Sequence, residues 1–412
     1  MKNCIVAQSG GPTAVINASL AGVIRGVIAS QEIDKIYGAV HGIEGVVNDD
    51  LIDLSSIFYK DSRINRLVHT PASYLGTCRH RLPLEDDNAE VYEKIYKTFD
   101  KHNIGYFFYI GGNDSMDTVD KLNKYAQKIG SDIKFIGVPK TIDNDLAVTD
   151  HTPGFGSAAK YIATSMREIV LDSQVYDIPT LTIVEIMGRN AGWLTAASAL
   201  ARSERHKICA PHYIYLPEVA MDVDKFVDDM VKAVKKHRNV VVAVSEGVKD
   251  KDGRYICEGG TPGETDAFGH TQLTGTAQAL AHEVRKKMDI KIRAIEFSLL
   301  QRSSAHIASL TDVNEAIEIG EFAVSAAIDG ATGVMIIVKR LSTNPYIVEL
   351  CTFNVAEIAN VERKVPLEWI TKDGNDVTND VVEYIRPLLE GESYPRFKHG
   401  VPHYITRHAS NT

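Results

Sequence analysis

The sequence predicts an α/β protein that is built on one largely parallel sheet or on two such sheets. Seven short runs are rich in β-branched and aromatic residues, and stretches with helical periodicity alternate with them. The apolar runs are continuous rather than alternating, which is typical of strands that helices cover on both faces. We expect strands at residues 4–8, 106–110, 134–138, 181–186, 240–245, 291–296 and 333–338, and helices at residues 14–29, 114–130, 157–172, 223–237, 273–288 and 314–329.

The length and composition limit the function classes. A chain of 412 residues can form two or three domains, and 44% hydrophobic with 24% charged residues is ordinary for a globular protein. The net charge of −9 argues against general affinity for nucleic acid or anionic lipid. No apolar run reaches the roughly 18 residues that span a membrane, and a signal peptide is not recognisable. Five scattered cysteines are typical of reduced thiols, so we expect a cytoplasmic protein that binds neither nucleic acid nor membrane.

In parallel sheets, ligands bind at the carboxyl ends of the strands, and the loop after the first expected strand is glycine-rich there. Gly10 and Gly11 allow backbone N–H groups to approach an anion at the start of the following helix. The loop matches neither Gly-x-Gly-x-x-Gly nor a Walker A pattern. A tight strand–helix turn without a ligand explains it equally well.

The loop after the second expected strand repeats this arrangement. It reads Gly-Gly-Asn-Asp-Ser over residues 111–115 and again opens a helix. Helix capping alone accounts for Asp114 and Ser115. A second pair of glycines at the head of a helix nevertheless favours an anion site that the two loops share.

The loop after the third expected strand carries the densest chemistry. Lys140, Thr141, Asp143 and Asp145 lie within six positions. Phosphoryl transfer needs a cation that stabilises charge on the moving group and a carboxylate that accepts the proton of the acceptor hydroxyl. Since one loop offers both, we interpret Asp143 as the base of a phosphotransferase.

Later loops add groups that could hold a sugar phosphate. Met187, Gly188 and Arg189 end a strand, and Arg at this place binds a phosphate in bidentate fashion or forms a surface ion pair. Glu246 has the same placement and accepts sugar hydroxyls or caps a turn. The remaining candidate cations are Arg79, Arg293 and Arg302.

Taken in order, these loops resemble the phosphofructokinase family from about Ile5 to about Gly330. Each matching segment is weak alone, whereas seven segments in register are specific. The segments are residues 10–12, residues 75–77 with Arg79, residues 111–115, residues 140–145, residues 187–189, Glu246, and residues 301–302.

The resemblance implies two Rossmann-like three-layer domains that face each other across an active-site cleft, with Mg²⁺ as the metal. We expect residues 1–148, completed by about 303–350, to form the phosphoryl-donor domain. Residues 149–302, completed by about 351–412, are expected to form the sugar-phosphate domain. A homodimer or homotetramer is expected by the same resemblance.

Two positions indicate the phosphoryl donor within the family. Members that use ATP have Gly at the places of Asp114 and Lys140, whereas members that use pyrophosphate have Asp and Lys, as this sequence does. A carboxylate at Asp114 repels the α-phosphate of a nucleotide and leaves room for a two-phosphate donor. The expected substrates are therefore pyrophosphate and fructose 6-phosphate, with fructose 1,6-bisphosphate and phosphate as products.

The resemblance also implies a role for each matching residue. Asp143, Lys140 and Asp114 are the expected catalytic residues, and Asn113 is the expected metal contact. The expected donor-binding residues are Gly11, Arg79, Gly112 and Ser115. The expected substrate-binding residues are Thr141, Ile142, Asp145, Met187, Gly188, Arg189, Glu246, Arg293, Leu299 and Arg302, of which Arg293 is expected to reach the 6-phosphate of a neighbouring subunit.

Three residues depart from the family pattern. Asn113 stands in place of an acidic residue linked to Mg²⁺, Leu299 in place of a His or Tyr, and Thr180 in place of an inter-subunit Arg. They leave open an ATP-dependent member, one that prefers sedoheptulose 7-phosphate, and a catalytically silent sugar-phosphate sensor. A dinucleotide-binding dehydrogenase is disfavoured because the glycine fingerprint is missing. For the stretch after Thr352, which carries no motif, we expect solvated surface or an oligomer contact.

Overall fold

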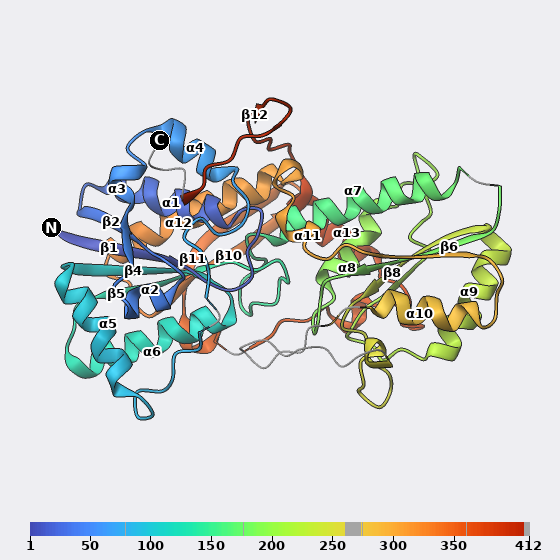
Figure 1. The fold of residues 1–412 in the computed structure, drawn as a ribbon, viewed down its shortest axis with the longest axis horizontal. Helices are drawn as coiled ribbons and strands as arrows, with labels where there is room; N and C mark the ends of the chain where they lie inside the picture. The colour runs from blue at the N-terminus through green and yellow to red at the C-terminus, as the bar shows by residue number, and fades with distance from the viewer. Residues whose placement is uncertain (79, 176, 260–272, 274, 360, 408–412) are drawn as a thin grey trace.

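The computed structural model describes residues 1–412 except residues 79, 176, 260–272, 274, 360 and 408–412. It confirms the α/β class, because two separate sheets of mainly parallel strands are each covered by helices on both faces (Figure 1). All seven expected strands and all six expected helices are present, with boundaries that differ by a few residues. No helix in the described part of the chain is long and apolar enough to cross a lipid bilayer.

The first sheet has seven strands in the order β11-β10-β5-β4-β1-β2-β3. The five inner strands run parallel to one another, and the two outermost strands are antiparallel to their neighbours. The strands are β1 (Lys2–Gln8), β2 (Ile33–Ala39), β3 (Leu51–Asp53), β4 (Ile104–Gly111), β5 (Lys134–Pro139), β10 (Val334–Thr343) and β11 (Tyr346–Asn354).

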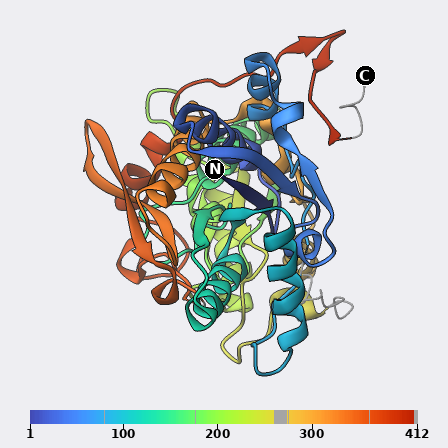
Figure 2. The ribbon, with the colours of Figure 1, turned by 90° about the vertical axis from the view of Figure 1, so that its left-hand side faces the viewer.

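Helices cover both faces of this sheet. One face packs on α1 (Ile16–Ser30), α3 (Leu54–Ile57), α4 (Asp61–Val68) and α12 (Leu310–Ile328). The other face packs on α2 (Ile43–Val47), α5 (Ala89–Lys101) and α6 (Asn113–Ile129). The view along the sheet in Figure 2 shows the orange β10–β11 pair at the edge of the blue and cyan strands.

Helices α1 and α12 approach each other unusually closely. A Cβ atom added to Gly22 would lie 2.1 Å from the carbonyl oxygen of Ile317, and one added to Gly320 would lie 2.4 Å from the carbonyl oxygen of Ser19. Real Cβ atoms do not approach backbone so closely. Glycine at both positions therefore permits the helices to touch backbone to backbone, and this contact attaches α12 to the first sheet.

The second sheet has four parallel strands in the order β7-β8-β6-β9. They are β6 (Thr180–Ile186), β7 (Tyr213–Tyr215), β8 (Asn239–Ser245) and β9 (Lys291–Glu296). One face packs on α7 (Phe155–Ser173), α8 (Trp193–Ala197) and α13 (Asn379–Ile385), and the other on α9 (Val223–His237) and α10 (Thr276–Arg285). The short helix α11 (Leu300–Ser303) leads from β9 toward α12, and β12 (Phe397–Lys398) with β13 (Val401–Pro402) forms a small hairpin.

Residues from distant parts of the chain complete each half of the molecule. The first sheet takes β10 and β11 from the second half of the sequence, and α13 packs on the second sheet (Figure 1). These packing relations support our proposal that residues 1–148 with about 303–350 form one domain, and residues 149–302 with about 351–412 the other. Within the last stretch, however, Val355, Ile358 and Ile405 pack in the cores of the first sheet.

Candidate active site

A cavity of about 720 Å³ lies where the carboxyl ends of strands from both sheets meet. Its lining comes from the loops after β1, β4, β5, β6 and β8, and from α11. The expected site residues that line it are Gly11, Gly112, Asn113, Asp114, Ser115, Lys140, Thr141, Ile142, Asp143, Asp145, Met187, Arg189, Glu246 and Arg302.

Lys140 makes hydrogen bonds to both glycine loops, at the end of the cavity where we expect the phosphoryl donor to bind (the donor end). Its backbone N–H donates to the carbonyl of Gly111 at 3.0 Å, and its Nζ donates to the carbonyl of Gly11 at 2.7 Å. The side chain is only 2% exposed, and burial lowers the pKa of its ammonium to about 8. A Cβ atom on Gly10 would lie 3.1 Å from Nζ, so the backbone of Gly10 packs closely against the end of the lysine side chain.

Arg302 also lies beside this glycine loop. It lies on α11, and its Nη1 is 3.2 Å from where a Cβ atom of Gly11 would be. Although the sequence predicts a sugar-phosphate contact for Arg302, the structure places its guanidinium beside the donor loop. Its charge adds to that of Lys140, whose pKa it helps to lower.

Asp143 and Asp145 are partly buried carboxylates that both line the cavity. Burial raises the pKa of Asp143, and Lys140, Arg189 and Arg302 oppose this rise. Burial raises the pKa of Asp145 to about 7, and the charge of Asp143 adds to the effect. Two carboxylates this close titrate as a pair. A raised pKa makes a carboxylate a stronger proton acceptor, as a general base requires.

Glu246 and Arg189 line the end of the cavity where we expect the sugar phosphate to bind (the sugar end). Glu246 follows β8 and accepts a hydrogen bond from the backbone N–H of Gly188 at 3.3 Å. Burial raises the pKa of Glu246 to about 8. Arg189 follows β6, and its buried Nε has no hydrogen-bond partner among the residues that the structure describes. A buried guanidinium N–H without a partner is costly, so it is suited to an anionic ligand.

Asn113 begins helix α6. Its buried Oδ1 lacks a hydrogen-bond partner within the described residues. An amide oxygen is a ligand for Mg²⁺, directly or through water. The described residues contain no group of three or more His, Cys, Asp or Glu side chains that could hold a metal ion. A cation here would therefore take most of its ligands from water and from the substrate.

Three expected residues that the structure describes, Gly188, Leu299 and Arg293, do not line the cavity. Gly188 adjoins it through its bond to Glu246, whereas Leu299 is 55% exposed at the start of α11 and lies outside it. Arg79 lies outside the described residues. Arg293 lines a separate hollow, described next. The roles of all these residues stay predictions.

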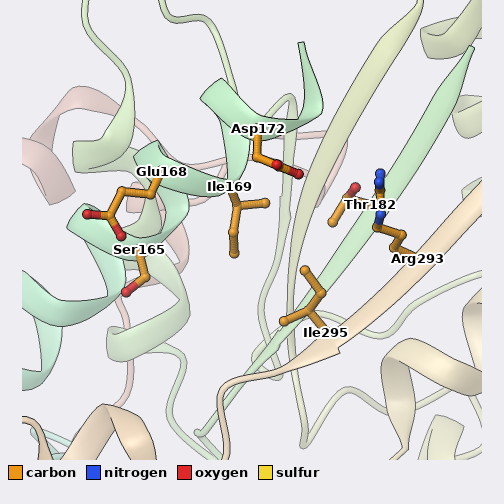
Figure 3. Close-up of a pocket in the computed structure, with 7 residues that line it drawn as sticks. All are labelled: Ser165, Glu168, Ile169, Asp172, Thr182, Arg293 and Ile295. Carbon is orange, nitrogen blue, oxygen red and sulfur yellow. The ribbon is translucent and has the colours of Figure 1, made fainter. Parts of the chain in front are cut away.

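Arg293 extends from β9 into a second hollow of about 300 Å³ (Figure 3). Figure 3 shows it beside Thr182, with Glu168 and Asp172 of α7 across the space. Its buried Nη1 has no hydrogen-bond partner in the described part of the chain. Arg293 therefore does not line the cavity of its own chain, and a contact with a sugar phosphate would have to involve another subunit.

The cavity also contains groups that the sequence did not assign to it. Arg81 and Asn190 neighbour expected residues in the sequence, but Glu362 comes from the C-terminal stretch that we expected to be solvated surface or an oligomer contact. Asn190 Nδ2 donates to Glu362 Oε1 at 3.0 Å, and Glu362 helps to raise the pKa of Asp145. No local pattern could have identified Glu362, because only the path of the chain brings it here.

The sequence matches the family described as Phosphofructokinase over residues 3–327. A pyrophosphate–fructose 6-phosphate 1-phosphotransferase from Methylococcus capsulatus is 41% identical over 410 residues, which cover 98% of this chain and 96% of the relative.

Solved structures of phosphofructokinases are also similar to this chain. A pyrophosphate-dependent phosphofructokinase from Nitrosospira multiformis is 39% identical with a TM-score of 0.87, and the match covers 98% of this chain and 96% of that one. One from Marinobacter aquaeolei is 39% identical with a TM-score of 0.86, over 98% and 95% of the two chains. The similarity therefore extends over both sheets and the cavity between them.

Proposed function

The chain belongs to the phosphofructokinase family, and from that premise we propose that it transfers a phosphoryl group reversibly from pyrophosphate to the 1-hydroxyl of fructose 6-phosphate. The observation that carries the proposal is the position of Asp143. This partly buried carboxylate lines one cavity with Lys140, Arg189, Arg302 and both glycine loops. A base surrounded by cations is what phosphoryl transfer to a hydroxyl requires.

In the forward reaction, Asp143 accepts the proton of the sugar 1-hydroxyl. The resulting alkoxide attacks the nearer phosphorus of pyrophosphate, a new ester bond forms, and the bridging P–O bond breaks to release phosphate. Lys140 and Arg302 both lie beside Gly11, so they can stabilise charge on the moving group and on the leaving phosphate. The reverse reaction uses the same groups in the opposite order.

Pyrophosphate is favoured over ATP by two side chains in the donor end of the cavity. Asp114 lies in the first turn of α6 and lines the cavity, where its carboxylate would repel a third phosphate. Lys140 fills the space beside Gly10 and Gly11. The relatives named for pyrophosphate support this assignment.

Mg²⁺ fits the charges that line the cavity. Five carboxylates (Asp114, Asp143, Asp145, Glu246 and Glu362) face four cationic side chains (Arg81, Lys140, Arg189 and Arg302). Two phosphorylated substrates would add several further negative charges. Asn113 Oδ1, which lacks a partner in the described residues, and the carboxylate of Asp145 would contact the ion. When bound, Mg²⁺ neutralises phosphate charge in the transition state.

A coupled assay tests the function. We expect fructose 1,6-bisphosphate to form with pyrophosphate and Mg²⁺, and little or none with ATP. Equal or faster turnover with ATP would overturn the donor assignment. Asp143→Ala should lower kcat with either donor by about 10²–10⁴-fold, the usual contribution of a general base.

The double variant Asp114→Gly, Lys140→Gly tests the basis of donor choice. It removes the repelling carboxylate and the space-filling lysine, so the ratio of ATP to pyrophosphate kcat/KM should rise. Asp117→Gly, on the same helix but paired with Lys121 at 2.6 Å, serves as a control that should leave the ratio unchanged.

The acceptor needs its own comparison because Leu299 and Thr180 depart from the family pattern. Leu299 is exposed outside the cavity, so no side chain there fixes the length of the acceptor. We propose fructose 6-phosphate as the preferred acceptor, and a higher kcat/KM with sedoheptulose 7-phosphate would replace it. Sugar-phosphate binding without any turnover would instead support a sensor.

We also propose a homo-oligomer in the cytoplasm. Arg293 points into a hollow outside its own cavity, which supports a contact with a second subunit. All five cysteines are free thiols, as is usual in reducing compartments. Light scattering and the redox state of the purified protein would test the two statements.

A further inference from the structure

The C-terminal stretch lies directly on the loop that carries Asp143. The backbone N–H of Arg363 donates to the carbonyl of Asp145 at 2.7 Å, and Leu146 pairs with Glu362 as an antiparallel bridge. Helix α13, drawn in red, lies beside the green helices α7 and α8 in Figure 1, and all three share one core. Residues more than 200 positions apart in the sequence thus form one local structure.

Asn144 lies between Asp143 and Asp145, and its side chain is hydrogen-bonded to the C-terminal stretch. It is fully buried, and its φ of 54° lies in the left-handed region, which asparagine adopts more readily than most residues. Its Nδ2 donates to the hydroxyl of Tyr384 at 2.9 Å. This hydrogen bond attaches the loop between the two carboxylates to Tyr384.

Tyr384 is itself held in place from several sides. Its hydroxyl donates to the carbonyl of Asp150 at 2.5 Å and accepts from the guanidinium of Arg363 at 3.3 Å. Its ring packs against Trp193 and Trp369, with centroids 5.2 Å and 5.6 Å away. The position of the hydroxyl is therefore fixed, and its hydrogen bond to Asn144 can fix the loop that carries Asp143.

We propose that Tyr384 is a positioning residue that, through its hydrogen bond to Asn144, sets the direction of the Asp143 and Asp145 carboxylates. The inference rests on the proposed function only in naming Asp143 as the base. Since Asn144 lies between the two aspartates, a rotation of its peptide planes moves both carboxylates at once. Misplacement of a reacting group by about 1 Å can cost about 10²-fold in rate.

The chain offers a matched control for a test with Tyr384→Phe. Tyr346 is a partly buried tyrosine of the same core, and its hydroxyl donates to Glu315 Oε1 at 2.6 Å rather than to the loop. Both rings stack on Arg340, at 4.7 Å for Tyr384 and 5.2 Å for Tyr346. Each Phe variant loses one hydroxyl, but only Tyr384→Phe loses the contact with Asn144.

We expect Tyr384→Phe to lower kcat at least tenfold while the KM for each substrate changes less than twofold. Tyr346→Phe, which loses one hydrogen bond where Tyr384→Phe loses several, should lower the melting temperature by less and keep kcat within twofold of the parent. Equal loss of kcat in the two variants, or an unchanged kcat in Tyr384→Phe, would overturn the proposal.

A double-mutant cycle separates positioning from general damage. Asn144→Gly removes the amide but tolerates the positive φ. If Tyr384 acts through Asn144, adding Tyr384→Phe to Asn144→Gly should leave kcat within twofold of the single variant. Additive losses would contradict the mechanism. If pyrophosphate proves not to be the donor, the cycle can be measured with ATP, so the two proposals fail separately.

Discussion

Burial shifts the pKa values of the ionisable groups in the Asp143 loop toward neutral pH, upward for the carboxylates and downward for the lysine. It raises the pKa of the Asp143–Asp145 pair, to about 7 for Asp145, and lowers that of Lys140 to about 8. A base and a cation with such values can both exchange a proton at physiological pH. Because a charged Asp143 and a charged Lys140 are needed together, the active ionisation state has a narrow pH range.

The pH dependence of kcat/KM should therefore be bell-shaped, since this parameter reports the free enzyme. We expect an acid limb where the carboxylate pair, whose pKa values burial raises, gains a proton, and an alkaline limb near pH 8, where Lys140 loses one. Initial rates at constant ionic strength would show both limbs. Lys140→Arg should shift the alkaline limb upward, and a flat profile from pH 6 to pH 9 would contradict the assignment.

Residues that lie in loops directly after predicted strands could be assigned to the site from sequence. Asp143 and Lys140 belong to this group, because an apolar strand and the polar loop that follows it are adjacent in the chain. Glu362 and Tyr384 could not be assigned, because their position depends on how the chain returns after β11. Arg302 was assigned to the cavity, but its proximity to Gly11 follows only from the orientation of α11.

At the scale of elements, the contact between α1 and α12 anchors the returning chain. Gly22 and Gly320 permit a backbone-to-backbone approach, and the apolar faces of both helices share one core with the first sheet. Alanine normally favours a helix by about 1 kcal/mol relative to glycine. At this contact, the steric effect opposes and outweighs that preference.

We expect Gly22→Ala to lower the free energy of unfolding by about 1–3 kcal/mol, the usual cost of overpacking. Gly26→Ala, on the same helix, should cost less, because its Cβ would meet the side chain of Val324 at 3.0 Å rather than backbone at 2.1 Å. Urea denaturation of the two variants would give the comparison. A Gly22→Ala protein as stable as the parent would show that the helices can separate at little cost.

Elements with continuous apolar runs could be predicted, and those with other patterns were missed. Strand β8 is Asn-Val-Val-Val-Ala-Val-Ser and is buried on both faces, as the sequence indicates. Strand β2 places exposed Asp34 and Lys35 near its start, and β11 alternates between exposed and partly buried residues at the sheet edge. The exposed residues within the inner strand β2 and the solvated face of the edge strand β11 both weaken the apolar signal, so neither strand was predicted.

At the scale of the whole molecule, the cavity draws ligands from both sheets. Substrate and cation should therefore stabilise the two halves together, by mass action on the native state. In the described residues, no group of three or more metal-ligating side chains exists without substrate. The cation is expected to bind well only together with pyrophosphate.

Melting temperatures would show this dependence. Mg²⁺ alone should shift the melting temperature by less than about 1 °C, whereas Mg²⁺ with pyrophosphate should raise it by several degrees. A ligand at about 100 times its Kd stabilises the native state by about 2.7 kcal/mol. A chelator should abolish turnover and leave the free protein folded. A large stabilisation by Mg²⁺ alone would indicate a preformed metal site.

The arrangement of the first sheet has a consequence for dissecting the protein. Strand β5 is joined on one side by β4 and on the other by β10, which follows it by almost 200 residues. A fragment that ends near residue 150 would therefore expose the unpaired edge of a strand that is apolar on both faces, and such edges recruit other chains. Neither half of the molecule is encoded by one continuous stretch, so expressing a half alone should yield aggregates rather than an isolated module.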